Sequence, residues 1–419
     1  MLTEQVQKAL AQVENGKPEE GLKKLKKLLS STDMTDELRF ETAQYLHALG
    51  YLDEAVNIYR QLVEAYPEED QLKLALAEAW SDRGQEEEAL ELLRQISSGS
   101  DQYLAGVLLS ADILLQQGLH EVALHKVRKA LEQHPEEKVL YQALGEIYFD
   151  QGEYSLALLN FNKGGQAPVK KLAECLAHLG RFEEALAKYQ EALQEERDPQ
   201  LLLGAGVVSF QMGAWAEAIG YFEKLIDHDP YFTSAYLYLV QAYYKINRLE
   251  DALDKADKGL RYDETNANLF YWRGFLLERK KETEKAKLSY LQAVELDPEL
   301  SEAWEALLHL SIEQNQVDDA LHYIKRLLEF SPDRADLWLK QGELLEELEE
   351  WDKAEQSYRK VLNLAPDHVE GLNRLADLLY AEGKRDEAIS LWKKSLKING
   401  DQWEIEERLE RALEEDDRW

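Results

Sequence analysis

The sequence predicts an all-α fold, an α-solenoid wound as a right-handed superhelix of about twelve helix-turn-helix units with a C-terminal capping helix. Three observations predict it. A small residue recurs at steps of about 34 residues along the 419-residue chain, a second small residue precedes it by twelve, and glycine or proline follows many of the expected helices. A fixed period of this length is typical of stacked helical repeats.

The small residue expected in the second helix of each unit defines the period. Every step between successive members is 34 residues, apart from one of 28 and one of 33. The members are Gly21, Ala55, Ala89, Ala123, Ala157, Ala185, Ala218, Ala252, Ala286, Ala320, Ala354 and Ala388.

The small residue expected in the first helix stands twelve residues earlier in ten of the twelve units, and only Val240 and Leu308 depart from the pattern. Antiparallel helices nest closely only where neither presents a bulky side chain at the crossing point. Ala286→Leu is therefore expected to cost about 1–3 kcal/mol. A glycine between the two small residues suits a left-handed turn, and a proline twelve residues after the second suits the boundary between units.

The stretch from Trp338 to Pro366, WLKQGELLEELEEWDKAEQSYRKVLNLAP, resembles the tetratricopeptide repeat. That repeat has small residues at positions 8 and 20, aromatic residues near positions 4, 11, 17 and 24, and proline at position 32. The resemblance covers essentially the whole chain. As an acidic chain built of repeats from end to end, it is similar to uncharacterised cytoplasmic bacterial members of the family.

The 28-residue step marks one irregular unit. Gly164 and Gly165, followed by Pro168, stand inside the expected second helix and predict that it ends early. The superhelix could change pitch or flex there, or the deletion could leave the stacking rigid. A second early helix end is expected at residues 97–100, which read Ser-Ser-Gly-Ser.

These boundaries predict three segments. Residues 1–166 form an N-terminal array of about five repeats, and residues 167–400 form a C-terminal array of about seven. Residues 401–419 form a capping helix, with Trp403, Leu409 and Leu413 as its apolar face, and an acidic tail.

Composition excludes several classes of function. The chain has 49 Lys and Arg against 82 Asp and Glu, a net charge of −33, which disfavours binding to nucleic acid or an anionic bilayer. The N-terminus lacks a secretory signal pattern, and no apolar run is long enough to span a membrane, so a cytoplasmic location is expected. The single cysteine excludes a disulfide framework within the chain.

No catalytic or metal-binding pattern is found. The histidines do not occur at metal-ligand spacing, and Cys175 lies beside Glu174, which is expected to raise its pKa. We therefore expect no enzyme activity, no cofactor and no metal.

The resemblance implies that the first helices line a concave groove, with positions 2, 5, 9, 12 and 13 of each unit facing it. Helical spacing alone places positions 5, 9 and 12 on one face. In three consecutive units these positions hold Leu203, Val207 and Phe210, then Leu237, Gln241 and Tyr244, then Tyr271, Phe275 and Glu278. The ninth position is acidic in flanking units, at Glu78, Asp112, Glu146, Glu174, Glu343 and Asp377.

This pattern favours a protein-interaction scaffold or adaptor. The expected partner is an extended peptide or helix with apolar anchors and Lys or Arg at its ends. Alternatively, the aromatic side chains pack against neighbouring helices and the acids are solvated. Two other functions remain open: a specificity subunit that delivers a client protein to a protease, kinase or chaperone, and a repeat enzyme.

Overall fold

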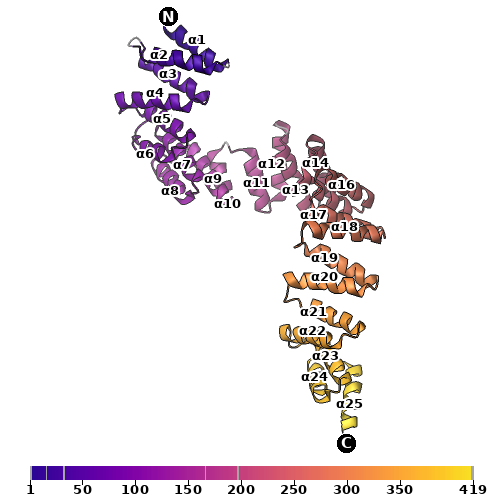
Figure 1. Cartoon of the computed structure of the whole chain (residues 1–419). Helices are drawn as coiled ribbons and strands as arrows, with labels where there is room; N and C mark the ends of the chain where they lie inside the picture. The colour runs from indigo at the N-terminus through magenta and orange to yellow at the C-terminus, as the bar shows by residue number, and fades with distance from the viewer. Residues whose placement is uncertain (1, 16, 32–33, 166, 196–197, 417–419) are drawn as a thin grey trace. The chain divides into compact units, whose positions relative to one another are not determined.

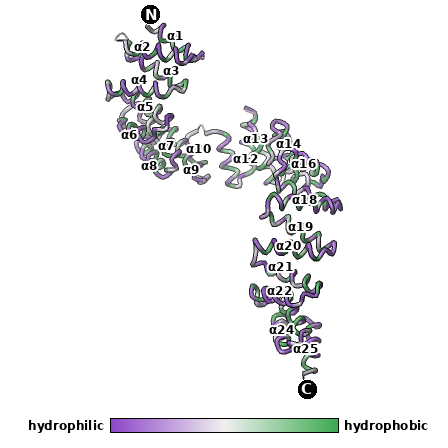
Figure 2. Tube along the Cα trace, in the orientation of Figure 1, coloured by the Kyte–Doolittle hydropathy of each residue, from purple (hydrophilic) through white to green (hydrophobic). Residues whose placement is uncertain are grey.

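In the computed structural model of the chain, the described residues are 2–15, 17–31, 34–165, 167–195 and 198–416, and all their regular elements are α-helices (Figure 1). The chain divides into two compact units, Met1–Arg197 and Asp198–Trp419, called unit 1 and unit 2 below. Along the helices, hydrophobic and hydrophilic residues alternate (Figure 2). Many of the helices, such as α16 (Leu249–Tyr262) and α20 (Val317–Phe330), have one face suited to the core and one suited to water.

Unit 1 contains the helices α1 to α12. Their bounds are α1 Leu2–Glu14, α2 Pro18–Leu29, α3 Asp36–Ala48, α4 Leu52–Ala65, α5 Asp70–Asp82, α6 Glu86–Leu93, α7 Tyr103–Gln116, α8 His120–Gln133, α9 Lys138–Asp150, α10 Tyr154–Gly164, α11 Val169–His178 and α12 Phe182–Glu195.

Unit 2 contains the helices α13 to α25. Their bounds are α13 Pro199–Gln211, α14 Trp215–His228, α15 Thr233–Lys245, α16 Leu249–Tyr262, α17 Ala267–Arg279, α18 Thr283–Leu296, α19 Ser301–Glu313, α20 Val317–Phe330, α21 Ala335–Glu347, α22 Trp351–Leu364, α23 Val369–Ala381, α24 Arg385–Ile398 and α25 Trp403–Asp416.

Odd-numbered helices are the first helices of repeats and even-numbered helices the second, giving twelve pairs followed by α25. The predicted all-helical repeat fold is thus confirmed. Most turns within a pair contain the predicted left-handed glycine, such as Gly213 with φ of 75°. Four turns place another residue in the same conformation: Asn247, Lys281, Asn315 and Glu349, with φ between 56° and 62°. The turn geometry is therefore kept where glycine is absent, at some conformational cost.

The crossing point of each pair is as tight as the small residues predict. A Cβ added to Gly274 would lie 2.7 Å from the Tyr290 ring, and Ala286 is fully buried. Gly206 faces Phe222 and Gly342 faces Tyr358 in the same way. Val240 is larger than the residue expected at its position. In the units with glycine there, the residue sixteen positions later is aromatic, but after Val240 it is Ala256, which leaves room for the valine.

Both predicted early helix ends are observed. Helix α10 has 11 residues and stops at Gly165, whose φ is 76°, and α6 has 8 residues, whereas α8 and α12 have 14. The predicted boundary at residues 166/167 lies inside unit 1. A hinge at this place stays a prediction.

The predicted apolar face of the capping helix is wrong in two of its three residues. Trp403 is 69% exposed and Leu413 39% exposed, whereas Ile405 and Ala412 are buried in the core with Leu409 packed partly against it. Spacings of four and seven residues from Ile405 define the buried stripe. The end of the predicted acidic tail, residues 417–419, lies outside the described residues.

Candidate functional site

The nine predicted groove residues lie on three consecutive first helices of unit 2, α13, α15 and α17. All nine are half-buried. The apolar ones among them pack partly against the buried core of unit 2, so each joins the core to the surface.

Aromatic rings connect these first helices to one another. Phe210 at the end of α13 meets Tyr238 of α15 edge-on, with ring centroids 5.5 Å apart. Tyr244 at the end of α15 contacts Trp272 of α17 at 5.9 Å and Phe275 at 5.1 Å. The predicted aromatic side chains therefore pack against the next repeat, and part of the surface of each ring stays exposed to solvent.

Tyr238 and Trp272 were absent from the sequence-based set. Both occupy position 6 of their repeats, and both extend the aromatic surface of this region, called the aromatic seam below: Phe210, Tyr238, Tyr244, Tyr271, Trp272 and Phe275. Two bulky aromatics at the same position of consecutive repeats were the signal available in the sequence.

Carboxylates of α19 border the seam. Burial, followed by the nearby charges of Glu302, Glu278 and Glu305, raises the pKa of Tyr271. Glu302 and Glu305 are exposed. The sequence analysis selected acidic residues only at position 9 of each repeat, and in the repeat of α19 this position is His309, so Glu302 and Glu305 were not included.

Glu278 is engaged within its own repeat. It accepts a hydrogen bond of 2.8 Å from the Tyr290 hydroxyl, and burial together with this hydrogen bond raises the pKa of Tyr290. Glu278 therefore helps to hold α17 against α18.

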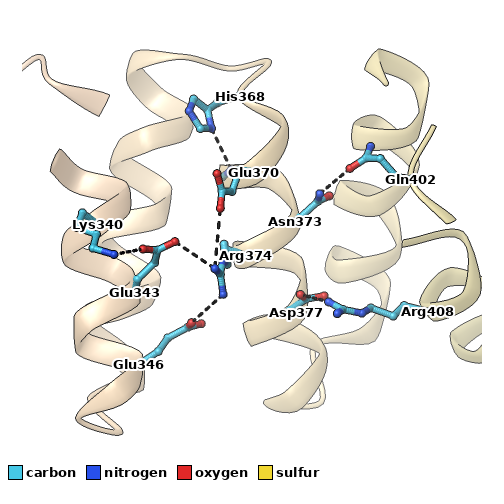
Figure 3. A network of polar contacts seen from close by, with 11 residues as sticks. Lys340, Glu343, Glu346, His368, Glu370, Asn373, Arg374, Asp377, Gln402 and Arg408 are labelled. Carbon is cyan, nitrogen blue, oxygen red and sulfur yellow. Dashed lines mark hydrogen bonds and ion pairs between the residues drawn. The ribbon is translucent and has the colours of Figure 1, made fainter. Parts of the chain in front are cut away.

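Two of the six predicted acidic residues lie in unit 2, and both are paired with arginine. Arg374 Nη2 of α23 lies 3.1 Å from Glu343 Oε1 of α21, and Arg408 of α25 pairs with Asp377 of α23 (Figure 3). Lys340 also donates to Glu343, at 3.0 Å.

The same relationship occurs in unit 1, where Lys171 of α11 pairs with Glu146 of α9. In all three pairs an acid at position 9 meets a base at position 6 of the following repeat. These pairs, called the ion-pair ladder below, tie consecutive first helices together. Half of the predicted acidic residues thus have a structural partner.

Glu78 and Asp112 lie on α5 and α7 of unit 1 and form no ion pair with lysine or arginine among the described residues. Position 6 of the next repeat holds Leu109 and Ala143, respectively, in place of a base. Partial burial raises the pKa of Glu78, against the opposing effect of His47, and raises the pKa of Asp112.

Glu174 lies on α11 and is half-buried. It is the second cause, after burial, that raises the pKa of Cys175 to about 11. This confirms the direction predicted for the thiol.

The described residues contain no group of three His, Cys, Asp or Glu side chains that could hold a metal ion. Within the same ranges, no helix is both long enough and apolar enough to cross a membrane.

Comparison with protein families and known proteins agrees with this architecture. A tetratricopeptide repeat model matches residues 214–399, a YpiA-like tetratricopeptide repeat model matches residues 116–163, and another tetratricopeptide repeat model matches residues 170–201. A model of the ARM repeat of tetratricopeptide repeat protein 21 matches residues 3–121.

The TPR repeat-containing protein YpiA of Bacillus subtilis is 31% identical over 330 residues, which cover 77% of this chain and 78% of YpiA. Human protein O-mannosyl-transferase TMTC1 is 29% identical over 198 residues, but these cover only 22% of that protein. Among solved structures, YrrB, described as a TPR protein with an unusual peptide-binding site, is similar over 45% of this chain and 96% of YrrB, with 21% identity and a TM-score of 0.39. The extent of the match to YpiA, together with the paired helices, shows that the chain belongs to the family of tetratricopeptide repeat proteins.

Proposed function

We propose that this chain is a non-catalytic scaffold or adaptor that binds a peptide or helix of a partner protein along the first helices of unit 2. Tetratricopeptide repeats are protein-interaction modules in general, and the aromatic seam is the observation that supports this particular site. It offers rings from three consecutive first helices, none of them fully buried. Half-buried aromatic side chains supply much of the binding energy at protein interfaces.

The partner segment has apolar anchors that lie on the seam and a basic side chain at the end nearest α19. Glu302 and Glu305 favour Lys or Arg there. Leu203, Val207 and Leu237 extend the apolar surface, and Gln241 offers a polar contact between them.

The acidic residues differ in how readily a partner could use them. Glu146, Glu343 and Asp377 already hold bases of their own chain, so a partner would have to displace these bases. Glu78, Asp112 and Glu174 belong to unit 1, and we assign them to contacts with basic partner segments. This chemistry fits a cytoplasmic protein that binds basic, partly apolar segments.

The test uses the full-length chain and a peptide library displayed on phage. Peptides that bind the wild type are measured by fluorescence anisotropy against Tyr271→Ala, Phe275→Ala and a control, Tyr231→Ala. Tyr231 is 74% exposed and lies outside the first helices. We expect each seam variant to weaken binding by about tenfold or more and the control to have no effect. Unchanged affinity in both seam variants would remove the proposal, once circular dichroism shows that they are folded.

A further inference from the structure

The joint between the second helices α20 and α22 differs from the joints on either side of it. Lys287 of α18 lies 2.8 Å from Asp319 of α20. Arg359 of α22 lies 2.8 Å from Glu387 of α24, and Lys384 lies 2.9 Å from Glu355. Among the described residues, no ion pair connects α20 to α22.

The sequence explains why an ion pair between second helices is missing at this joint. The pair of Lys287 and Asp319 joins residues 32 positions apart, and the equivalent residues one repeat later are Leu321 and Lys353. Leucine cannot pair with the lysine opposite it. Lys353 instead pairs with Glu350 of its own repeat, at 2.5 Å.

A groove of about 710 Å³ lies at this joint, and α20, α21 and α22 follow one another in the stack (Figure 1). Leu321, Trp338 and Leu345 contribute apolar surface to it. Ser357 donates a hydrogen bond of 3.0 Å to Gln341, which satisfies two polar groups in the lining. The groove therefore combines an apolar surface with polar walls, as ligand sites commonly do.

The lining of this groove is basic although the chain is strongly acidic. Its cations are Lys325, Lys353, Arg359 and Lys360, against the two acids Asp318 and Glu350. Lys353 and Arg359 are paired with acids of the chain. Lys325 and Lys360 are exposed and form no ion pair with any described residue. They stand on opposite walls, on α20 and α22.

We propose that this groove, the α20/α22 groove, binds an acidic segment of a partner protein that carries a central apolar side chain. The apolar side chain lies against Trp338 and Leu345, and Asp or Glu side chains on either side of it pair with Lys325 and Lys360. A peptide fits better than a small anion, because the apolar surface would give an inorganic anion nothing to contact. A chain with a net charge of −33 repels acidic ligands over most of its surface, so these lysines define where one can bind.

This site is separate from the aromatic seam, since it lies on α20, α21 and α22, whereas the seam lies on α13, α15 and α17, and since it takes a partner of opposite charge. Its test therefore does not depend on the seam. The probe is a phage-displayed pool of twelve-residue peptides rich in Asp and Glu, selected on the full-length chain. Selected peptides are then synthesised with a fluorescent label.

Binding is measured with Lys325→Glu/Lys360→Glu and with the control Lys393→Glu/Lys397→Glu. The control lysines are exposed on α24 and change the net charge equally, and Lys393 occupies the same repeat position as Lys325. We expect peptides with Leu, Ile, Phe or Trp between acidic residues to lose about tenfold or more in affinity with the groove variant and less than about twofold with the control.

Four outcomes overturn the proposal. In the first, the pool yields no peptide whose binding depends on Lys325 and Lys360. In the second, both double variants weaken binding equally, which would indicate a general charge effect. In the third, replacing the apolar residue of a selected peptide by serine leaves its affinity unchanged. A single-stranded oligonucleotide that competes for the groove and loses binding in the same variant would assign it to nucleic acid instead.

Discussion

Tyr244 of α15 meets Phe275 of α17 edge-on, with ring centroids 5.1 Å apart and an interplanar angle of 79°. This geometry directs the positive edge of one ring toward the negative face of the other. The contact joins two repeats, so these residues stabilise the stack as well as offering a surface to a partner.

Truncating one ring of this pair is expected to weaken the stack. Phe275→Ala should lower the free energy of unfolding by about 1–3 kcal/mol, less than for a fully buried phenylalanine, because the ring is half-buried. Urea unfolding followed by circular dichroism measures it. Leu288→Ala is the control, because Leu288 is 63% exposed on α18 and should have almost no effect.

Glycine at the crossing point of the first and second helices should not tolerate even a methyl group. In Gly274→Ala the new Cβ would lie 2.7 Å from the Tyr290 ring, so we expect a loss of about 1–3 kcal/mol. Gly220 of α14 has no atom within 4 Å of an added Cβ, and Gly220→Ala should gain about 0.5–1 kcal/mol through helix propensity. Equal effects of the two substitutions on thermal unfolding would contradict the crossing-point explanation.

The ion-pair ladder should show as a coupling energy between first helices. In a double-mutant cycle of Glu343→Gln and Arg374→Gln, we expect a coupling of about 0.5–1 kcal/mol at low salt, because the arginine is 42% exposed. The coupling should decrease when salt is raised, since exposed charges are screened. Additive effects of the two substitutions at low salt would mean that the pair contributes nothing.

Acid should weaken the joint between α22 and α24. Hydrogen bonds from Lys384 and Arg359 lower the pKa of Glu355 below its ordinary value of 4.5. The ionised carboxylate therefore favours the folded state, and its contribution is present above pH 4.5 and lost as the pH falls through the lower folded-state pKa. Glu355→Gln should reduce the unfolding temperature at pH 7, and the difference from wild type should be smaller at about pH 3.

The matched control for this pH dependence is Glu347→Gln. Glu347 is exposed on α21 and forms no ion pair with a described residue, so its replacement should have little effect at either pH. A loss for Glu355→Gln that is the same at both pH values would contradict an electrostatic origin.

The Cys175 thiol should be unreactive in the folded chain. The side chain is fully buried, and burial followed by the charge of Glu174 raises its pKa to about 11. At pH 8 the native protein should react with a thiol reagent far more slowly than the unfolded protein, because the thiolate is scarce and inaccessible. Rapid modification of the native chain would show that α11 opens readily.

The repeat pattern was sufficient to predict the fold because each small residue reports directly on a helix crossing. The spacing of Gly164 and Gly165 likewise predicted the short α10. The face of α25 was harder, because Trp403 and Leu413 are as apolar as the buried Ile405, and only the register of packing against α24 separates them.

The candidate site was predicted in part. The repeat position alone was enough to select Glu343 and Asp377. Their ion pairs depend on Arg374 and Arg408 in the next repeat, and contacts between side chains of neighbouring repeats could not be predicted from the sequence. The α20/α22 groove was missed for a related reason. Lys325 and Lys360 resemble ordinary surface lysines until the absence of an acid opposite them is known.

The ion pair of Lys171 and Glu146 forms although the repeat between Ala157 and Ala185 is six residues shorter than the usual 34. The two residues of this pair are 25 positions apart, whereas Arg374 and Glu343 are 31 apart. The difference is divided between two shortened helices: α10 has 11 residues where α12 has 14, and α11 has 10 where α9 and α13 have 13. The first helices on either side keep their register although the second helix between them is truncated. The shortening behind this surface therefore leaves the contact between position 9 of one repeat and position 6 of the next in place.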